Sequence, residues 1–378
     1  MQFVTRLPPD VDVRWFFFED GDFAQTVRGK FPSVTIVPMS ERVARAQRRG
    51  LPISAVLDSV SLIRRLTRAL RTDRPDLVVT NSMKAHVLGS IAAKLAGLRC
   101  INYIHDLVDG RALDLLRLVS RVCAVERLTC SNLVKRHLRL GATTVVYASI
   151  DADAFARLPD RRESRRALGL PQTDIPIVGL VGRIARWKGQ DRFIRIASYV
   201  LATHDVHFCI VGSPIFGCDD DYVTDLRDDV ARRGLAHKIT FVPWQETMQT
   251  VYAAVDIACN CSEREPFGRT TLEAMASRVP VVCFDDAGVC ELFEQNCGGV
   301  RVPAGDERAF AAAIVDYLRS PGEREIAGED ARRTAKRTDI EHAYREFVAA
   351  LERVSGSAVD GSRNILPSVG PVPAANVI

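Results

Sequence analysis

Two carboxylates stand on either side of a tight turn in the segment CSEREPFGRTTLEAMASRVPVVCF, residues 261–284. Glu265 precedes the Pro-Phe-Gly turn, and Glu273 follows it in a stretch whose apolar residues have helical spacing. A helix that begins at this turn directs its first backbone N–H groups toward an anion. Because carboxylates accept hydrogen bonds from vicinal hydroxyls, the arrangement suits a phosphate flanked by two sugars, as in a nucleoside diphosphate sugar.

A structural role explains the same two carboxylates. Glu265 can be a charge at a helix start, and Glu273 can be half of an i,i+4 ion pair. The residue four positions after Glu273 is Ser277 rather than a cation. The structural alternative therefore stays open, although Ser277 cannot be the cationic partner of Glu273.

A second candidate anion site lies in the segment GLVGRIARWKGQDRFIRIA. An apolar run ends at Gly182, Arg183 and Lys188 lie five residues apart, and a helical pattern follows. Glycine admits close backbone approach, and two cations beside a helix start can neutralise a diphosphate. The segment matches neither a Walker A loop nor a G-x-G-x-x-G loop. Two exposed cations on a strand-to-helix loop are the structural alternative.

Short apolar runs alternate with amphipathic helical patterns along the chain, which predicts an α/β fold with parallel sheets. Strands are predicted at RWFFF, SVTIVPM, DLVVT, CINYIH, VCAVE, TTVVYAS, PIVGLVG, VHFCIVG, KITFVP, VDIACNC, VPVVCF and GGVRV. The 378-residue length favours two domains. The predicted division is a first domain at 1–150, a linker with a short helix at 151–175, a second domain at 176–335, a helix at 336–355 and a disordered tail at 356–378.

The charge of the chain is unevenly distributed. Residues 1–150 carry 23 Lys and Arg and 13 Asp and Glu, a balance of +10, which leaves −6 for the rest of a chain of net charge +4. A first half with this much positive charge suggests an anionic partner. The structural alternative is that the arginines of SLIRRLTRALRTDRP lie on a helix face exposed to solvent. No aromatic residues interleave these arginines, which argues against nucleic acid and leaves an anionic membrane surface.

Cellular setting and cysteine chemistry follow from what the chain does not contain. No run of about 18 apolar residues occurs, and Pro8, Pro9 and Asp10 interrupt the start of the sequence, so we expect a cytoplasmic protein. The ten cysteines form no C-x-x-C pair or other zinc or haem spacing, which predicts buried free thiols. The expected cytoplasmic location and the basic first half together predict peripheral contact of the protein with the inner face of the membrane.

The segment EPFGRTTLE resembles the E-x7-E motif of retaining GT-B glycosyltransferases of the family 4 group. The segments VGRIARWKGQD, FCIVGS, KITFVPWQETMQTVYAAVDIACNCS and VPVVCFDDAGVCELF are similar to further motifs of that group in the same order, over roughly residues 75–350. The resemblance implies the GT-B fold, in which two Rossmann-like domains face a cleft.

The same resemblance implies roles for individual residues. Arg183 and Lys188 would bind the donor diphosphate, Glu273 the ribose hydroxyls, and Glu265 the transferred sugar. His105, in INYIHD, would hydrogen bond to the donor sugar or the acceptor. The other donor-site positions implied are Gly182, Val242, Trp244, Phe267, Gly268, Arg269 and Thr270.

Several positions depart from the pattern of that group. Asn81 stands where histidine is usual, Pro243 replaces a glycine, and Ala287 precedes Gly288 where two glycines are usual. The acidic run Asp219 to Asp221 falls in a loop of variable sequence. Enzymes that resemble this one neutralise the leaving diphosphate with Arg and Lys, so we expect no metal and no cofactor.

The implied activity is transfer of a hexose from a nucleoside diphosphate sugar to a hydroxyl with retention of configuration, in polysaccharide, lipopolysaccharide or glycolipid synthesis. The acceptor would be a glycan or a lipid-linked molecule. A catalytically silent nucleotide-sugar-binding protein and a GT-B nucleotide-sugar epimerase are the alternatives. Members of the group begin with a strand, a Gly-rich loop and a helix before the strand that VDVRWFFFEDGDF resembles, whereas about ten residues precede it here. The resemblance thus predicts that residues 1–150 lack these elements.

Overall fold

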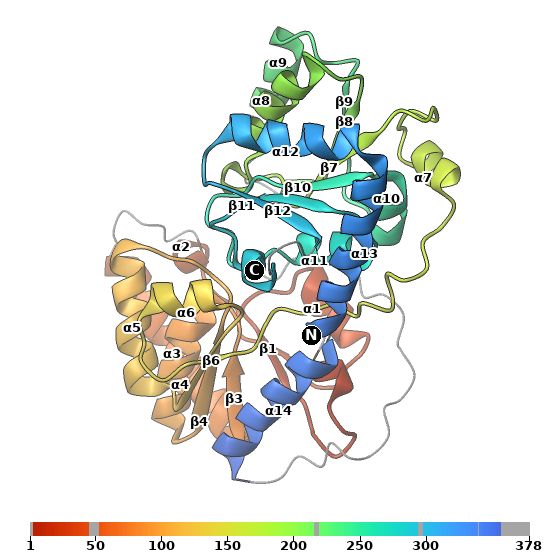
Figure 1. Ribbon diagram of the computed structural model, residues 1–378. Coiled ribbons are helices and arrows are strands. Elements are labelled where there is room, and N and C mark those ends of the chain that lie inside the picture. Colours follow the sequence, from red (N-terminus) through yellow and green to blue (C-terminus); the bar gives the residue numbers. More distant parts are fainter. Residues whose placement is uncertain (1–2, 45–52, 215–218, 294–297, 339, 357–378) are drawn as a thin grey trace. The chain divides into compact units, whose positions relative to one another are not determined.

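The structure is a computed structural model that describes residues 3–44, 53–214, 219–293, 298–338 and 340–356 (Figure 1). The chain forms two compact units. The first comprises the residues up to Tyr147 together with the C-terminal helix from Ala343, and the second is Ala148–His342. Apart from residue 356, the segment expected to be a disordered tail lies outside the described residues.

The strands of the first unit form two separate parallel sheets. One pairs β1 (Trp15–Phe17) with β2 (Val34–Ile36). The other has the order β3-β4-β5-β6, with β3 (Leu77–Thr80), β4 (Arg99–Ile104), β5 (Glu126–Thr129) and β6 (Thr144–Val145). In the described residues β3 is an edge strand, and its Val79 is 40% exposed.

Helices pack around these sheets. They are a 3-10 turn Val4–Arg6, α1 (Asp22–Arg28), α2 (Glu41–Ala44), α3 (Ile53–Asp73), a π-helical turn Ala85–Gly89, α4 (Ser90–Ala96), α5 (Gly110–Cys123), α6 (Asn132–Leu138) and α14 (Ile340–Ser355). Helix α4 contacts β3 and β4 as well as α3 and α5. From α14, the Tyr344 hydroxyl donates to the Arg6 carbonyl at 2.9 Å, and Phe347 stacks on Phe3. The C-terminal helix thus belongs to the core of the first unit.

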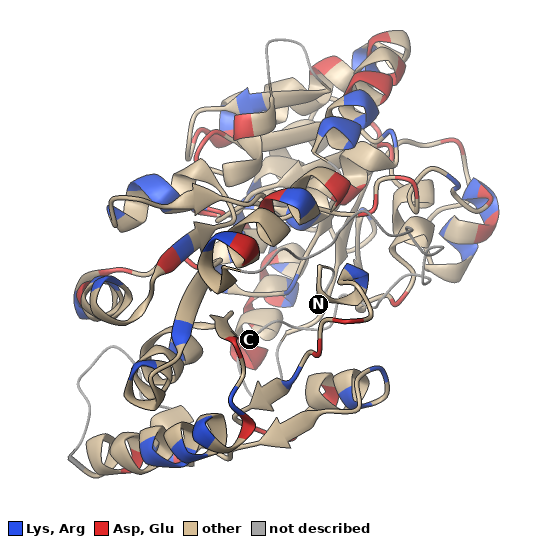
Figure 2. Ribbon diagram, turned by 90° about the horizontal axis from the view of Figure 1, so that it is seen from below, with Lys and Arg blue, Asp and Glu red and all other residues tan. Residues whose placement is uncertain are grey.

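Helix α3 has the two faces that its sequence predicts. Leu62, Leu66 and Leu70 are buried in the core, while the three arginines between them are exposed. Figure 2 shows the Lys and Arg positions along this long helix. The positive charge of SLIRRLTRALRTDRP therefore lies on a solvent-facing helix surface.

One predicted strand is wrong. The run VCAVE reads as a strand because of its valines, but Val122 and Cys123 end α5, and β5 begins at Glu126. The helix buries Leu113, Leu116 and Val119 on one side and continues that spacing to its last turn. The other predicted runs each overlap an observed strand.

The second unit contains a six-stranded parallel sheet of order β12-β11-β10-β7-β8-β9. The strands are β7 (Ile177–Val181), β8 (His207–Val211), β9 (Ile239–Val242), β10 (Ile257–Asn260), β11 (Val281–Phe284) and β12 (Gly299–Val302). Strands β8, β10 and β11 are buried along their whole length. Such unbroken apolar runs are typical of strands covered on both faces.

The helices of this unit are α7 (Arg161–Ala167), a 3-10 turn Arg186–Lys188, α8 (Gln190–Leu201), α9 (Asp220–Arg232), α10 (Met248–Ala254), α11 (Arg269–Ala276), a 3-10 turn Gly288–Leu292, α12 (Glu307–Arg319) and α13 (Pro321–Arg337). Helix α7 falls within the segment 151–175, which was predicted to be a linker with a short helix. It packs against α10.

Helix α7 carries a buried charge network. The Arg165 side chain is 2% exposed, and its guanidinium donates to the carbonyls of Thr173 and Ala254 and to Asp256 at 3.1 Å. Arg161 donates to both oxygens of Asp256 at 2.7 Å. The network fixes α7 to the loop that precedes β10.

The strand order reverses between β7 and β10. The chain proceeds outward from β7 through β8 to β9 and then returns to the other side of β7 with β10. At such a switch point the loops after the two central strands diverge, and ligands of open α/β sheets bind there, beyond the carboxyl ends of the strands. This edge of the sheet is therefore the place to look for the predicted anion site.

The described cysteines agree with the prediction of free thiols. All eight are free, and seven of them are buried, Cys123 being the partly exposed one. Cys218 and Cys297 lie outside the described residues. None of the helices that the structure describes combines the length and apolarity needed to cross a bilayer.

Candidate functional site

The loop after β7 carries the two predicted cations. Arg183 follows Gly182 directly, and Lys188 ends the 3-10 turn Arg186–Lys188. The side-chain amide of the buried Gln190 donates to the Arg183 carbonyl at 2.9 Å, which fixes the start of the loop. The Trp187 ring contacts both cations, with its centroid 4.2 Å from Lys188 Nζ and 5.8 Å from Arg183 Cζ.

Gly189 allows this loop to approach the loop after β10. Its φ is +72°, and an added Cβ would lie 2.1 Å from the Cys261 carbonyl oxygen. A side chain would therefore force the two backbones apart. The backbone N–H of Glu263 also donates to the Trp187 carbonyl at 2.7 Å.

The close approach brings Lys188 to Glu265. Lys188 Nζ lies 2.6 Å from Glu265 Oε2, and the two side chains are 16% and 7% exposed. The Ser262 hydroxyl donates to the same oxygen at 2.7 Å. In the part of the chain that the structure describes, Glu265 Oε1 accepts no protein hydrogen bond. A charged pair with one open carboxylate oxygen thus lies at the switch point of the sheet.

Two glycines hold the turn between the carboxylates. Gly268 precedes α11 with φ at +101°, and its carbonyl accepts the first helical hydrogen bonds, from Thr271 and Leu272. The N–H of Gly288 donates to the Glu265 carbonyl at 2.8 Å, and an added Cβ there would lie 2.2 Å from the Pro266 carbonyl oxygen. The backbone that carries Glu265 and Phe267 is therefore packed tightly against the loop after β11.

Glu273 lies in α11 and is buried, with 5% exposure. The Tyr252 hydroxyl lies 2.8 Å from the Thr270 carbonyl and 3.2 Å from Glu273 Oε2, so it shares one proton between them. Arg269, four residues before Glu273, lies 4.0 Å from the carboxylate. Burial raises the pKa of Glu273, while Arg269 and the Tyr252 hydroxyl oppose the shift. The i,i+4 partner exists, but it precedes Glu273 rather than following it.

The loops after β8 and β9 border the same edge. An added Cβ on Gly212 would lie 2.0 Å from the Gly182 carbonyl oxygen, and the Trp244 N–H donates to the Ser213 hydroxyl at 3.0 Å. Val242 is buried in β9, whereas the Trp244 side chain is 45% exposed. Of these two donor-site positions implied by the resemblance, only Trp244 presents its side chain at the surface of this unit.

His105 lies in the first unit, directly after β4. Its Nε2 is 2.8 Å from Asn81 Oδ1, and its ring lies 4.1 Å from that of Tyr103. Asn81, the residue that replaces the usual histidine, follows β3. The two side chains therefore meet at the carboxyl ends of neighbouring strands.

The acidic run Asp219 to Asp221 begins α9. Asp219 has a left-handed backbone with φ at +64°, and Asp220 and Asp221 lie in the first helical turn, where the helix dipole favours negative charge. Among the residues described, no group of three or more His, Cys, Asp or Glu side chains is arranged to hold a metal ion.

Sequence reasoning missed Trp187, Ser262 and Tyr252. All three act through contacts with predicted site residues, and each stands in a segment of ordinary composition. Only the position of Tyr252, within the segment KITFVPWQETMQTVYAAVDIACNCS that is similar to a motif of the group, gave a signal, and that signal named no role.

Comparison with known proteins bears mainly on the second unit. Residues 160–334 match the sequence model of the glycosyl transferases group 1 family. The match begins beside α7 and ends within α13, so it contains the loops that carry Arg183, Lys188 and Glu265 and the helix that carries Glu273.

Two similar proteins are lipopolysaccharide core biosynthesis mannosyltransferases. LpcC of Rhizobium leguminosarum bv. viciae is 30% identical over 223 residues, which cover 59% of this chain and 60% of the relative. LpsB of Rhizobium meliloti is 31% identical over 212 residues, which cover 55% of this chain and 60% of the relative. The chain thus spans less than two thirds of either relative.

Solved structures show the same fold over most of the chain. HepE of Anabaena, in complex with UDP-glucose, has a TM-score of 0.77 at 23% identity and covers 89% of this chain and 91% of its own. Sucrose-phosphate synthase of Thermosynechococcus elongatus has a TM-score of 0.73 at 19% identity and covers 93% of this chain and 87% of its own. The α/β fold with parallel sheets is thus that of GT-B glycosyltransferases, as the sequence motifs predicted.

Proposed function

We propose that this protein is a retaining glycosyltransferase that moves a hexose from a nucleoside diphosphate sugar to a hydroxyl acceptor. One observation carries the proposal: the ion pair of the partly buried Lys188 with the buried Glu265 joins the loops after β7 and β10 at the switch point of the sheet. A cation and an open carboxylate oxygen side by side suit a ligand with a phosphate next to sugar hydroxyls.

Lys188 can serve both groups at once. An ammonium group has three donors, and Glu265 takes one of them, which leaves two directions for phosphate oxygens. The ion pair holds Nζ in place before the donor arrives, so little reorganisation is needed as negative charge grows on the leaving diphosphate. Arg183, which also contacts the Trp187 ring, would add a second cation.

Glu265 and Glu273 would then bind the two sugars of the donor. Glu265 Oε1 would accept from hydroxyls of the transferred hexose, and Glu273 from the ribose, with Tyr252 orienting the Glu273 carboxylate. The bond from the anomeric carbon to the phosphate oxygen breaks as the acceptor oxygen bonds to that carbon from the same face. The acceptor proton passes to the leaving phosphate oxygen, so atoms and charge balance without a covalent enzyme intermediate.

The relatives support the substrate classes of this proposal. The HepE structure holds UDP-glucose, and the two Rhizobium relatives are mannosyltransferases of lipopolysaccharide core biosynthesis. We therefore propose a UDP- or GDP-linked hexose as donor and a glycan or lipid-linked molecule as acceptor. The basic first half suits peripheral contact with an anionic membrane that carries such an acceptor.

The test is a panel of UDP- and GDP-sugars in which nucleoside diphosphate release is followed with and without added glycan acceptors. We expect release with one donor, unchanged by a chelator, because Arg183 and Lys188 take the place of a divalent ion. Tight nucleotide binding without release or transfer under every condition would instead indicate a silent binding protein. Interconversion of two nucleotide sugars would indicate an epimerase.

A further inference from the structure

Helix α5 of the first unit has an apolar outer face. Leu115, Leu118 and Val122 are 42%, 60% and 53% exposed, and their spacing places them along one side of the helix. A different side, with Leu113, Leu116 and Val119, is buried in the unit. The helix is therefore apolar on a side that faces solvent as well as on the side that faces the core.

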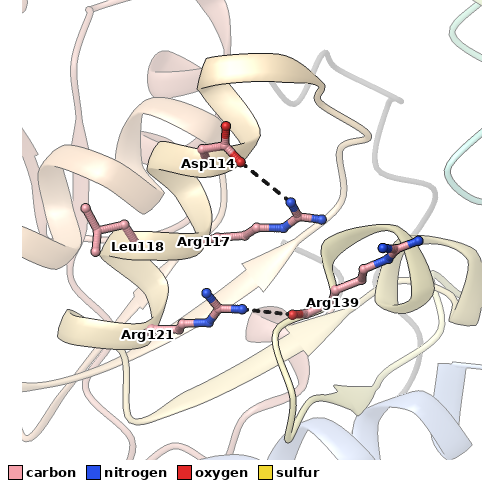
Figure 3. A pocket seen from close by; sticks show the side chains of 5 residues that line it. All are labelled: Asp114, Arg117, Leu118, Arg121 and Arg139. Atoms are coloured by element: carbon pink, nitrogen blue, oxygen red, sulfur yellow. Dashed lines mark hydrogen bonds and ion pairs between the residues drawn. The ribbon is translucent and has the colours of Figure 1, made fainter.

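A basic hollow lies directly beside this face. It has a volume of about 400 Å³ and is lined by Asp114, Arg117, Leu118, Arg121 and Arg139 (Figure 3). Three guanidinium groups and one carboxylate give it a surplus of positive charge. Leu118 belongs to both the hollow and the apolar face, so the two are continuous.

Two arginines of the hollow are held in place by the end of α6. Arg117 Nε donates to the Leu138 carbonyl at 2.7 Å, and Arg121 donates to the Arg139 carbonyl at 3.1 Å. Arg139 itself ends α6 in a left-handed conformation, with φ at +51°. The side chains of Arg117 and Arg121 are thus anchored, and the backbone of Arg139 accepts one of these hydrogen bonds.

The surface continues onto the end of α4. Lys94 Nζ donates to the Val122 carbonyl at 2.6 Å, and the next residue, Leu95, is 54% exposed. Arg71 at the end of α3 donates to the Leu95 carbonyl at 2.7 Å. Exposed leucine or valine next to a cation therefore continues from α5 onto the end of α4, and the end of α3 adds the cation Arg71.

We propose that this α5 face, Leu115, Leu118 and Val122 with the rim Arg117, Arg121 and Arg139, docks on an anionic lipid membrane. Its leucines and valine would enter the interface between headgroups and acyl chains, and its arginines would bind lipid phosphates. Charge complementarity selects this occupant. Nine of the twelve exposed large apolar side chains in the described residues lie in the first unit, whose residues 1–150 carry the balance of +10.

The inference rests on the proposed function and deepens it, because a surface of this kind would bring the acceptor side of the enzyme to a lipid-linked acceptor. Vesicle binding itself needs neither donor nor catalysis. A protein that does not bind vesicles could still release nucleoside diphosphate, and a protein that releases none could still bind vesicles. The two proposals can therefore fail separately.

The test is co-sedimentation of the full chain with vesicles of phosphatidylcholine alone and of phosphatidylcholine mixed with phosphatidylglycerol. We expect binding to the anionic vesicles that weakens with added salt. Leu118→Asp should lower the partition about tenfold or more, because an apolar side chain is lost from the interface and a like charge is added. Arg121→Gln should lower it about fivefold.

Two variants of matched exposure serve as controls. Leu57→Asp changes a 65% exposed leucine on α3, and Ile326→Asp changes a 64% exposed isoleucine on α13 of the second unit. Both should bind vesicles as the unchanged protein does. Val122→Asp is a second substitution on the α5 face. Thermal melting of each variant separates a loss of vesicle binding from a loss of folding.

Three outcomes would overturn the proposal. One is equal partition of the unchanged protein onto the two kinds of vesicle at low salt. Another is loss of binding with Leu57→Asp but not with Leu118→Asp, which would move the contact to α3. The third is a dimer in solution that Leu118→Asp converts to a monomer while vesicle binding persists, which would make the α5 face an interface between two copies of this chain.

Discussion

Removing the charge of Lys188 should destabilise the second unit as well as slow the reaction. Nζ lies 2.6 Å from Glu265 Oε2, and neither side chain is more than 16% exposed. Lys188→Met would leave the Glu265 carboxylate buried, with the Ser262 hydroxyl as its remaining side-chain donor in the described residues. Breaking a buried pair in this way costs about 3–5 kcal/mol. For a unit of this size, a loss of about 3 kcal/mol corresponds to a melting temperature lower by about 6–12 °C.

The two roles of the pair can be separated by a double-mutant cycle. Glu265→Gln removes the uncompensated charge, so Lys188→Met combined with Glu265→Gln should lose less stability than the two single changes together, by about 2 kcal/mol. Turnover should not recover in the same protein. Loss of one preorganised donor to the leaving group lowers the rate about a hundredfold, and the neutral pair supplies no replacement.

The assay is calorimetric unfolding of the four proteins, with nucleoside diphosphate release measured on each. The loop backbone should keep its place in all four, because Gly189 and the hydrogen bond from the Glu263 N–H to the Trp187 carbonyl are unchanged. A melting temperature of Lys188→Met equal to that of the unchanged protein would show that the pair is not desolvated. Strictly additive losses in the double variant would show that the two charges do not interact. Full turnover in Lys188→Met would refute the assignment of this lysine to the leaving group.

Three further perturbations test the rest of the site. Tyr252→Phe should weaken UDP binding about tenfold but leave the affinity for 2′,3′-dideoxy-UDP unchanged, because the lost hydroxyl orients the carboxylate assigned to the ribose. Calorimetric titration measures both affinities, and an equal loss of affinity for the two ligands would contradict this role. Burial raises the pKa of Glu273 above 4.5, so the native state binds this proton more tightly than the unfolded chain does, and stability should fall as pH rises through the interval above 4.5. Glu273→Gln should remove that part of the slope in melting curves across pH, and an unchanged slope would show that another group is responsible. Gly288→Ala should lower both turnover and melting temperature, because its Cβ would lie 2.2 Å from the Pro266 carbonyl oxygen; Gly322→Ala, with no atom within 4 Å of the added carbon, is the matched control and should behave as the unchanged protein does.

Most strands of both units could be located from the sequence because buried parallel strands form unbroken apolar runs. Runs such as VHFCIVG and VPVVCF are short, rich in β-branched residues and bounded by Gly, Pro or charged residues. The run VCAVE failed because α5 ends in apolar residues on its exposed side as well as on its buried side. When both sides of a helix are apolar, its sequence is a continuous apolar run, and such a short run cannot be told from a buried strand by periodicity.

The partners within the site could not be predicted from local sequence. Lys188 and Glu265 are 77 residues apart, and only the strand order brings the loops after β7 and β10 together. Sequence spacing does allow an i,i+4 pair on either side of Glu273, but the prediction considered only Ser277 and overlooked Arg269. Tyr252 reaches Glu273 from a different helix, which no local pattern encodes.

Helix α7 also determines where the second unit must begin if it is to be joined to another protein. A fragment that begins at β7 would keep all six strands of the sheet and lose Arg161 and Arg165. Asp256, whose side chain is 8% exposed, would then retain Arg324 at 4.0 Å as its remaining cation in the described residues. Removing partners from a buried ion pair costs up to about 3–5 kcal/mol, against a total stability of about 5–15 kcal/mol for a typical domain. Chimeras that exchange the second unit should therefore be joined upstream of Asp160, whose side chain caps α7, so that Asp256 keeps its arginine partners.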